Sequence, residues 1–497
     1  MKDFAPILIL LVAVTIVVVR LPKVDLGHSD AFKRRRLLNW LPLGLTYAFL
    51  YMGRYNLTVS KIALGDLMSK EEFGTIFFWG TIVYGFAFVI NGPLTDRFGG
   101  RAAILAAASG AAVMNLLMGV FTWGMLTKQG WASGLPMVPT FSVLYAANMY
   151  FQSFGAVSIV KVNAAWFHVR ERGVFGGIFG ILISLGVYFA YDWGALIVKN
   201  APTWWVFFVP AGILACFGLI DVFAVRDSPA QAGLKDFDTA DASSGDQGPQ
   251  LGAVQVAKLM LRNPVILVIA GIEFFSGFLR NAIMQWYPIM AKESGLGESL
   301  RFGEAFVSKN WGMLLCCAGI LGGVVAGVIS DRVFDSRRGP VASILYGGML
   351  VGAVIMTTLL GSPLLGWMVV FMSLCIIGVH GMLSGTASMD FGGRKNVGVA
   401  VGLIDGCVYL GTAAQSLLLG QILPKGADTK VAGNWSNWPL AMIPAALIGL
   451  FLATRVWNAR AKPKQVVTPA TDVSPGAPQG TQLDTSKPLD AKSDAVA

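Results

Sequence analysis

Long apolar runs separated by short polar segments make up most of the chain. A helix needs about 20 mostly apolar residues to cross the ~30 Å hydrocarbon core of a bilayer, and runs of this length recur along the sequence. We expect twelve transmembrane helices, at residues 38–60, 74–95, 102–127, 139–162, 173–195, 203–225, 265–291, 309–330, 340–361, 363–388, 398–422 and 437–457. A shorter apolar run, Phe4 to Val19, predicts either an extra spanning anchor within residues 1–24 or a misassigned start codon.

The apolar runs fall into two groups of six. The predicted N-terminal half covers residues 36–225 and the C-terminal half residues 265–457, with a polar linker at 226–264. Residues 458–497 are rich in Pro, Ala, Asp, Ser and Thr, and a segment with so few large apolar residues is expected to be disordered. The predicted fold class is an all-α polytopic membrane protein with 12 transmembrane helices, to which the N-terminal run adds another if it spans.

Composition strengthens this interpretation. Only 13% of the 497 residues are charged and 55% are apolar, whereas soluble domains carry about 25% charged residues. So few charges exclude a soluble enzyme. The sequence contains no P-loop, GxSxG or HExxH motif, and its five cysteines lie in apolar runs without CxxC spacing, so we expect no catalytic site, cofactor or metal site.

Lys and Arg are unevenly distributed between the two sides of the predicted bundle. Clusters such as Lys33 to Arg36 and Arg337-Arg338 lie on the same side as the C-terminus. The positive-inside rule assigns the richer side to the cytoplasm. We therefore expect a protein of a bacterial inner membrane with a cytoplasmic C-terminus. The net charge of +10 follows from this topology, and no nucleic-acid partner is expected.

The two halves also repeat short motifs at similar offsets. The stretch Gly92 to Arg97 reads G-x-x-x-D-R, as does Gly327 to Arg332, and Arg54 in span one corresponds to Arg280 in span seven. Similar offsets indicate an internal duplication. The G-x-x-x-D-R loops are either gates or basic loops that only set topology, and the second, less regular copy leaves both interpretations open. The candidate gating residues are Asp96, Arg97, Arg101, Asp331 and Arg332.

Two arginines are predicted at matching depth inside the membrane. Inserting an ionisable group there costs roughly 2.5 to 3.5 kcal/mol on insertion scales, so each arginine is expected to have a binding role or a partner of opposite charge. Arg54 and Arg280 should both face a central cavity, where two planar guanidinium forks would suit a bidentate anion such as phosphate. The alternative is neutralisation by a structural acid, for which Glu273 lies seven residues before Arg280 on the same helical face.

The sequences around these arginines resemble the organophosphate:phosphate antiporters of the major facilitator superfamily. Span one contains the pattern Y-x-x-x-Y-x-x-R-x-N from Tyr47 to Asn56, and span two contains Tyr84-Gly85-Phe86. Further similar stretches are Phe151-Gln152, Arg170 to Gly173, Leu279-Arg280 with Trp286 and Pro288, and Asp390 through Arg394-Lys395 to Gly411. The G-x-x-x-D-R-x-G-x-R loop also recurs in that superfamily.

The resemblance implies a fold, a mechanism and a site. It implies the major facilitator fold, alternating access, and exchange against inorganic phosphate without ATP. It also implies that two arginines bind the phosphoryl group and that tyrosines line the cavity around it. The residues that carry over are Arg54, Arg280, Tyr47, Tyr51, Tyr84 and Tyr409.

The chain departs from the family pattern at several positions. Phe88 replaces a lysine of span two, and Ile183 stands where the family has a histidine. Lys161 is either a substrate contact or a snorkelling residue near the cytoplasmic mouth. Asp405 is a candidate to pair with a cationic substrate group, carry a proton or cap a kinked helix. These differences make strict glycerol-3-phosphate exchange doubtful.

We therefore predict a secondary transporter of a small organophosphate or related organic anion. Its expected partners are that anion, inorganic phosphate and the lipid bilayer, and the chain is expected to act as a monomer. One alternative is a proton-coupled permease that uses Glu273 or Asp405. The other is a transporter-like phosphosugar sensor that binds its ligand without net flux.

Overall fold

The computed structural model describes residues 26–168, 172–237, 261–296, 304–334, 337–383 and 388–458, together with positions 15, 255 and 258. Within these ranges, side chains are not described for residues 172–179, 304–305, 328, 331–332 and 388–401. Apart from those single positions, the predicted anchor at 1–24 and the centre of the linker lie outside the described residues. The predicted tail lies outside them beyond residue 458.

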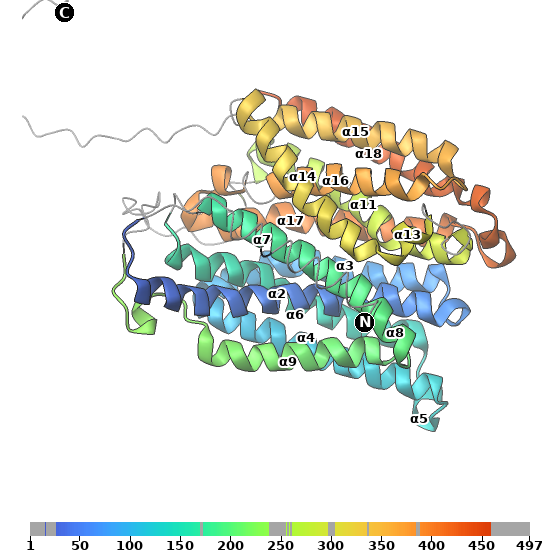
Figure 1. Ribbon diagram of the computed structural model, residues 1–497, viewed down its shortest axis with the longest axis horizontal. Helices are drawn as coiled ribbons and strands as arrows, with labels where there is room; N and C mark the ends of the chain where they lie inside the picture. Colours follow the sequence, from blue (N-terminus) through green and yellow to red (C-terminus); the bar gives the residue numbers. More distant parts are fainter. Residues whose placement is uncertain are drawn as a thin grey trace, which may run out of the picture. The chain divides into compact units, whose positions relative to one another are not determined.

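The first half contains six long helical segments (Figure 1). They are α2 (Asp30–Leu64), α3 (Lys70–Phe98), α4 (Gly100–Leu126), α6 (Met137–Trp166), α7 (Arg172–Tyr188) with its continuation through a π-helical turn η3 (Phe189–Trp193) into α8 (Gly194–Asn200), and α9 (Trp205–Ala224). Short helices lie between and after them at α5 (Gly130–Ser133), η1 (Gly65–Leu67) and η4 (Ala230–Ala232).

The second half contains six more long helices. They are α11 (Pro264–Glu293), α14 (Trp311–Val333), α15 (Arg338–Leu359), α16 (Leu365–Met382), α17 (Ser388–Ile422) and α18 (Asn437–Arg455). The short elements are α13 (Glu304–Lys309), η6 (Gly426–Lys430) and η7 (Ala432–Ser436). Ten of the described helices are long and apolar enough to span a bilayer. With the more polar α2 and the shorter apolar stretch of α14, the predicted all-α fold with twelve spans is confirmed.

Several helix ends follow directly from the sequence. Ser69 and Glu72 form a capping box at the start of α3, in which each side chain bonds the other residue's backbone N–H. Asn263 caps α11 and Pro264 occupies its first turn. Gly99 separates α3 from α4 with φ +90°, a conformation that L side chains rarely adopt.

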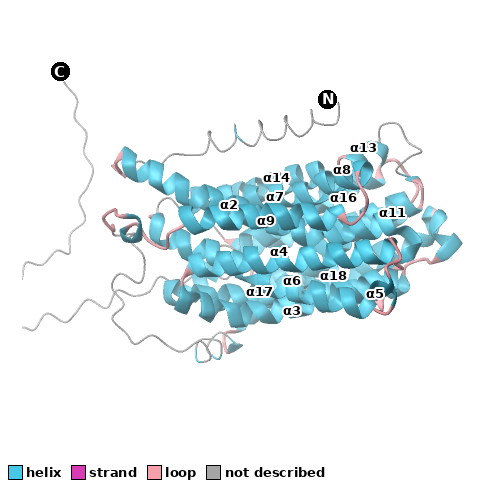
Figure 2. Ribbon diagram, turned by 90° about the horizontal axis from the view of Figure 1, so that it is seen from below, coloured by secondary structure: helices cyan, strands magenta, loops and turns pink. Residues whose placement is uncertain are grey.

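The described elements of both halves are helices joined by loops (Figure 2), and the packing of the first half repeats in the second. Within the first half α2 contacts α7 and α9, and α4 contacts α6 and α9; within the second half α11 contacts α17 and α18, and α15 contacts α16 and α18. Between the halves, α3 packs against α17 and α7 packs against α14. The duplication predicted from the motif offsets therefore has a counterpart in the helix contacts.

Small residues allow the closest helix contact near the middle of the bundle. A Cβ atom added at Gly277 of α11 would overlap the carbonyl of Val408, and one added at Gly411 of α17 would overlap the carbonyl of Phe274. Helix pairs approach this closely only where glycine removes the side chain. This contact brings Tyr409 of α17 beside Arg280 of α11.

Candidate functional site

Arg54 lies at the centre of the bundle and is completely buried. Its Nε donates to Gln152 Oε1 at 3.0 Å, Nη1 donates to the Tyr409 hydroxyl at 2.9 Å, and Nη2 donates to the Tyr84 hydroxyl at 2.7 Å. Tyr84 and Gln152 come from α3 and α6 of the same half, whereas Tyr409 comes from α17 of the other half. The guanidinium of Arg54 therefore bonds to both halves of the molecule.

Aromatic rings surround this guanidinium. Its Cζ lies 4.6 Å from the centroid of Tyr51 and 4.4 Å from that of Tyr84. Tyr47 lies one layer further out, with its hydroxyl 3.3 Å from that of Tyr51. Cation–π contacts of this kind partly replace the hydration that a buried cation loses. The structure thus brings Arg54 together with all four predicted tyrosines, three directly and Tyr47 through Tyr51.

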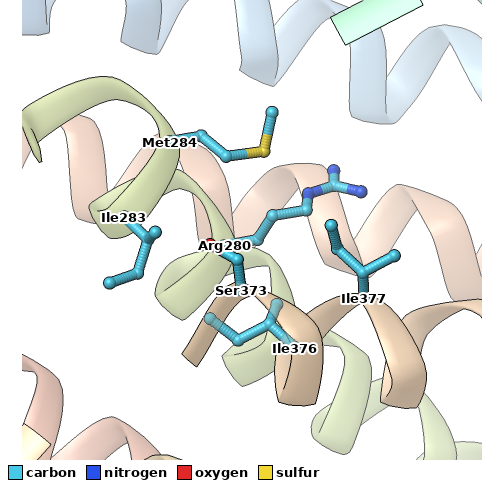
Figure 3. A pocket seen from close by; sticks show the side chains of 6 residues that line it. All are labelled: Arg280, Ile283, Met284, Ser373, Ile376 and Ile377. Carbon is cyan, nitrogen blue, oxygen red and sulfur yellow. The ribbon is translucent and has the colours of Figure 1, made fainter. Parts of the chain in front are cut away.

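Arg280 approaches the same tyrosine from the other side. Its Cζ lies 5.5 Å from the ring centroid of Tyr409, and the side chain is 9% exposed. Beside it is a narrow pocket between α11 and α16, lined by Arg280, Ile283, Met284, Ser373, Ile376 and Ile377 (Figure 3). Figure 3 shows the Arg280 side chain reaching from α11 towards Ile377. Tyr409 therefore lies between the two predicted anion-binding arginines.

Neither arginine is paired with an acid in the described part of the chain. The ion pairs found there involve Glu71, Asp96, Glu273 and Glu293, and their partners are lysines and one histidine. The acid considered for Arg280, Glu273, instead places its Oε2 3.0 Å from Nδ1 of His380 on α16. The predicted alternative of neutralisation by Glu273 is thus not the arrangement that the structure has.

Polar side chains of α6 bond to one another and to the backbone at Gly53 and Arg54. Gln152 Nε2 donates to Asn148 Oδ1 at 3.1 Å, Asn148 Nδ2 donates to the Gly53 carbonyl at 2.9 Å, and the Tyr145 hydroxyl donates to the carbonyl of Arg54 at 3.2 Å. Asn148 and Tyr145 are not among the residues expected from the sequence, and Gln152 entered only as part of the Phe151-Gln152 motif. The available signal was the spacing of Tyr145, Asn148 and Gln152, which places three polar residues on one face of an apolar helix.

At one end of the bundle, polar contacts join the halves. This end, here called the Glu293 end, has Glu293 of α11 paired with Lys61 and Lys70 of the first half, and Lys425 Nζ 2.7 Å from Glu71 Oε2. Asp192 in the π-helical turn accepts hydrogen bonds from the backbone N–H groups of Gly312 and Met313, at 2.7 and 3.0 Å. A carboxylate at the start of α14 is favoured by the unpaired N–H groups and the helix dipole.

The opposite end, here called the Asp96 end, holds the first gating loop. Asp96 Oδ1 lies 2.6 Å from Lys161 Nζ, and both residues belong to the first half. The backbone N–H of Arg101 donates to Asp227 at 2.8 Å, and Arg97 contacts Phe98. Lys161 therefore lies at the mouth of the bundle, away from Arg54. The side chains of Asp331 and Arg332 lie outside the described residues.

The remaining candidates lie in the second half. Glu273 is completely buried against His380, and Asp405 lies on α17 near enough to interact electrostatically with Glu273. Phe88, which replaces the family lysine, packs against Tyr84 and Tyr409 with ring centroids 4.8 and 5.9 Å away. Among the described residues no group of three or more His, Cys, Asp or Glu side chains could hold a metal ion.

Comparison with known proteins adds relatives of similar length. A glycerol-3-phosphate transporter of Bacillus subtilis is 25% identical over 455 residues, which cover 87% of this chain and 95% of that protein. The membrane sensor protein UhpC of Salmonella typhimurium is 25% identical, with 86% and 92% covered. A probable hexose phosphate transport protein of Chlamydia trachomatis is 24% identical, with 86% and 92% covered.

Solved structures share the fold at low sequence identity. A bacterial homolog of the human lysosomal transporter Spinster, in an inward-facing conformation, aligns with a TM-score of 0.63 at 12% identity over 86% of this chain and 98% of that one. The nucleoside transporter NupG aligns with a TM-score of 0.61 at 11% identity over 85% and 100%. A family model described as Major Facilitator Superfamily matches residues 43–416. This chain is therefore a multi-span integral membrane protein that belongs to the Major Facilitator Superfamily.

Proposed function

We propose that this chain carries a small organophosphate or related organic anion across the membrane by alternating access, in exchange for inorganic phosphate. The observation that carries the proposal is the environment of Arg54, which is completely buried and whose hydrogen-bond partners among the described residues are all neutral oxygens. Burying a charge without a partner of opposite charge costs several kcal/mol. A phosphoryl group bound between Arg54 and Arg280 would supply that charge and match both planar forks.

The names of the relatives support the substrate class. The glycerol-3-phosphate transporter and the hexose phosphate transport protein are each matched over nearly their whole length. The residues that resemble the organophosphate antiporters, Tyr47, Tyr51, Arg54, Tyr84, Arg280 and Tyr409, are also those that meet around the two guanidinium groups.

The contacts of Tyr409 suggest how binding and movement are linked. The hydroxyl of this second-half residue accepts a hydrogen bond from Nη1 of the first-half Arg54, so that donor is already in use. An incoming phosphoryl group would take that donor, and Tyr409 would then be free to move with its own half. The cross-half contacts of the Glu293 end would break when the site opens there. We infer from the positive-inside rule that the Asp96 end and the C-terminus face the cytoplasm, and from the bacterial relatives that the membrane is a bacterial inner membrane. Because one chain contains the whole site, we propose that it acts as a monomer.

Uptake into proteoliposomes tests the proposal. Vesicles loaded with inorganic phosphate should take up radiolabelled glycerol 3-phosphate or a hexose phosphate faster than vesicles without phosphate, and unlabelled organophosphates should compete better than carboxylates. The double variant Arg54→Lys with Arg280→Lys keeps both charges but loses both forks, and should abolish uptake. Unchanged uptake by this variant would refute binding of the phosphoryl group between Arg54 and Arg280, an arrangement here called the anion clamp.

A second candidate function is ligand sensing. The similarity to UhpC, whose name describes a membrane sensor, is as strong in identity as the similarity to the glycerol-3-phosphate transporter. A sensor would bind the organophosphate through the same arginines. Binding to purified protein with no flux into loaded vesicles would favour sensing, whereas binding with flux would favour transport.

A further inference from the structure

A buried acid–imidazole pair lies in the second half, outside the anion clamp. Glu273 of α11 is completely buried, and its Oε2 lies 3.0 Å from Nδ1 of His380 on α16. The His380 side chain is 21% exposed. The other carboxylate oxygen of Glu273, Oε1, is buried without a hydrogen-bond partner among the described residues. A carboxylate with one unsatisfied oxygen is an unfavourable place for a net negative charge.

Among the side chains that the structure describes, the groups facing Glu273 from the neighbouring helices provide no positive charge besides His380, and Arg280 acts on it from α11 itself. Asp405 and Cys407 face it from α17 and Tyr346 faces it from α15. The Tyr346 hydroxyl donates to the Ile272 carbonyl at 2.6 Å, and Asp405 would add negative charge when ionised. On α18, which also packs against α11, the sole ionisable residue is the exposed Arg455. Arg280 is the nearest cation on α11 itself, two turns further along the helix.

We propose that Glu273 and His380 form a proton-binding site whose occupancy strengthens anion binding at Arg280. This inference rests on the proposed function, because it assigns a coupling ion to the same transport site. With neutral His380 donating from Nδ1 to ionised Glu273, the pair carries one negative charge. A proton taken up at Nε2 gives an imidazolium–carboxylate pair with no net charge, and no other bond is made or broken.

The position of the pair explains why the proton and the anion should act together. Arg280 lies seven residues after Glu273 on α11, which corresponds to about 10 Å along a helix. The narrow pocket beside Arg280 is lined by Ile376 and Ile377, one turn before His380 on α16. For an anion bound at about that distance from the pair, removing one negative charge should strengthen binding by on the order of tenfold at an effective dielectric constant of ~20. The effect is reciprocal, so anion binding should also strengthen proton binding.

Titration calorimetry of the full-length purified protein tests this coupling. Inorganic phosphate is the probe, and binding is measured at several pH values in buffers with different ionisation enthalpies, which counts the protons taken up. Phosphate itself titrates, so the informative quantity is the difference between wild type and Glu273→Gln at the same pH. Wild type should take up close to one proton more than the variant where the pair is unprotonated. Equal proton uptake by both proteins would overturn the proposal.

The variants also separate coupling from a structural role. Glu273→Gln removes the buried charge and should retain, at alkaline pH, the tighter phosphate binding that wild type shows only at acidic pH. His380→Gln removes the proton acceptor and should hold the affinity at the weak, alkaline value. Loss of binding by Glu273→Gln at all pH values, with an unchanged melting temperature, would contradict the proposal. Asp428→Asn, at an exposed carboxylate, is the matched control and should behave like wild type.

Two failures remain distinguishable. If wild type binds neither phosphate nor any organophosphate, the proposed function fails. If wild type binds phosphate in an Arg280-dependent way but Glu273→Gln takes up as many protons, only the proton site fails.

Discussion

Arg54 and Arg280 occupy equivalent places in the two halves but have different surroundings. Arg54 makes three hydrogen bonds, lies against the rings of Tyr51, Tyr84 and Tyr409, and is completely buried. Arg280 contacts the Tyr409 ring, borders a pocket and retains 9% exposure. An acid–imidazole pair lies two turns from Arg280, whereas no acid lies seven residues before Arg54, where the sequence has Tyr47.

The two halves thus place an arginine at an equivalent position but surround it differently. The first-half arginine is held rigidly by neutral oxygens, which suits it to orient a phosphoryl group. Arg280 has fewer bonds and lies two turns from the Glu273–His380 pair, so the affinity of Arg280 for an anion should depend on the charge of that pair. The predictions below test this asymmetry, from the largest expected effect to the smallest.

Locking the Glu293 end should hold Arg54 in its bonded environment and stop transport. Glu71 and Lys425 form an ion pair between the halves. In a Cys216→Ser background, the double variant Glu71→Cys with Lys425→Cys would be joined by a short bifunctional thiol reagent. We expect near-complete loss of uptake into proteoliposomes and recovery after cleavage of the linker. The single Glu71→Cys variant treated with the same reagent is the control. Transport by the crosslinked protein at the unmodified rate would refute opening at this end.

The two arginines should differ in their tolerance of lysine. Hydrogen bonds to charged groups contribute about 1.5–3 kcal/mol each. Arg54→Lys cannot preserve all three bonds and should lower initial uptake by about 100-fold, whereas Arg280→Lys should lower it by about 10-fold. Arg455→Lys, on the exposed end of α18, should change uptake little. An equal or larger loss at Arg280 would contradict the asymmetry.

The tyrosine hydroxyls should rank by the number of arginines that they reach. Tyr409 bonds Arg54 and lies against Arg280, whereas Tyr47 reaches Arg54 only through Tyr51. The Tyr409 hydroxyl competes with the phosphoryl group for Nη1 of Arg54, and a hydrogen bond to a charged group contributes about 1.5–3 kcal/mol. We therefore expect Tyr409→Phe, which frees this donor, to strengthen phosphate binding by about 10-fold and Tyr47→Phe to change it by no more than about 2-fold, as measured by calorimetry. The reverse order would place the anion nearer to the Tyr47 side of the cavity.

Lys161, the remaining cation among the candidate site residues inside the first half, should matter least. Its side chain and that of Asp96 are 42% and 39% exposed, and exposed ion pairs contribute about 0–1 kcal/mol. Lys161→Gln should change uptake by less than about 2-fold and the free energy of unfolding by less than about 1 kcal/mol. A loss comparable to that of Arg280→Lys would extend the anion path to the Asp96 end.

Much of the fold could be predicted from the sequence. The apolar runs located all twelve spans, because burying about 20 apolar residues is a local requirement that each helix meets independently. The capping box at Ser69 and the proline after Asn263 explain individual helix starts in the same way. The resemblance around Tyr47 to Asn56 also indicated which side chains would gather near Arg54.

The partners within the site could not be predicted in this way. His380 was not proposed as the partner of Glu273, since nothing in the spacing of α11 and α16 indicates how the two helices are rotated against each other. The network of Tyr145, Asn148 and Gln152 was similarly missed, because polar residues inside an apolar helix carry no sign of the helix that they face.

By itself, the sequence determined that this chain is a twelve-helix membrane protein with one arginine at matching depth in each half. Only the tertiary structure decided that Arg54 bonds Tyr409, which lies 355 residues away, and that Glu273 pairs with His380 instead of Arg280. The physical reason is the distance along the chain over which each interaction acts. Hydropathy and capping act within one helix, whereas the partner of a buried charge depends on how helices from different parts of the chain pack and rotate.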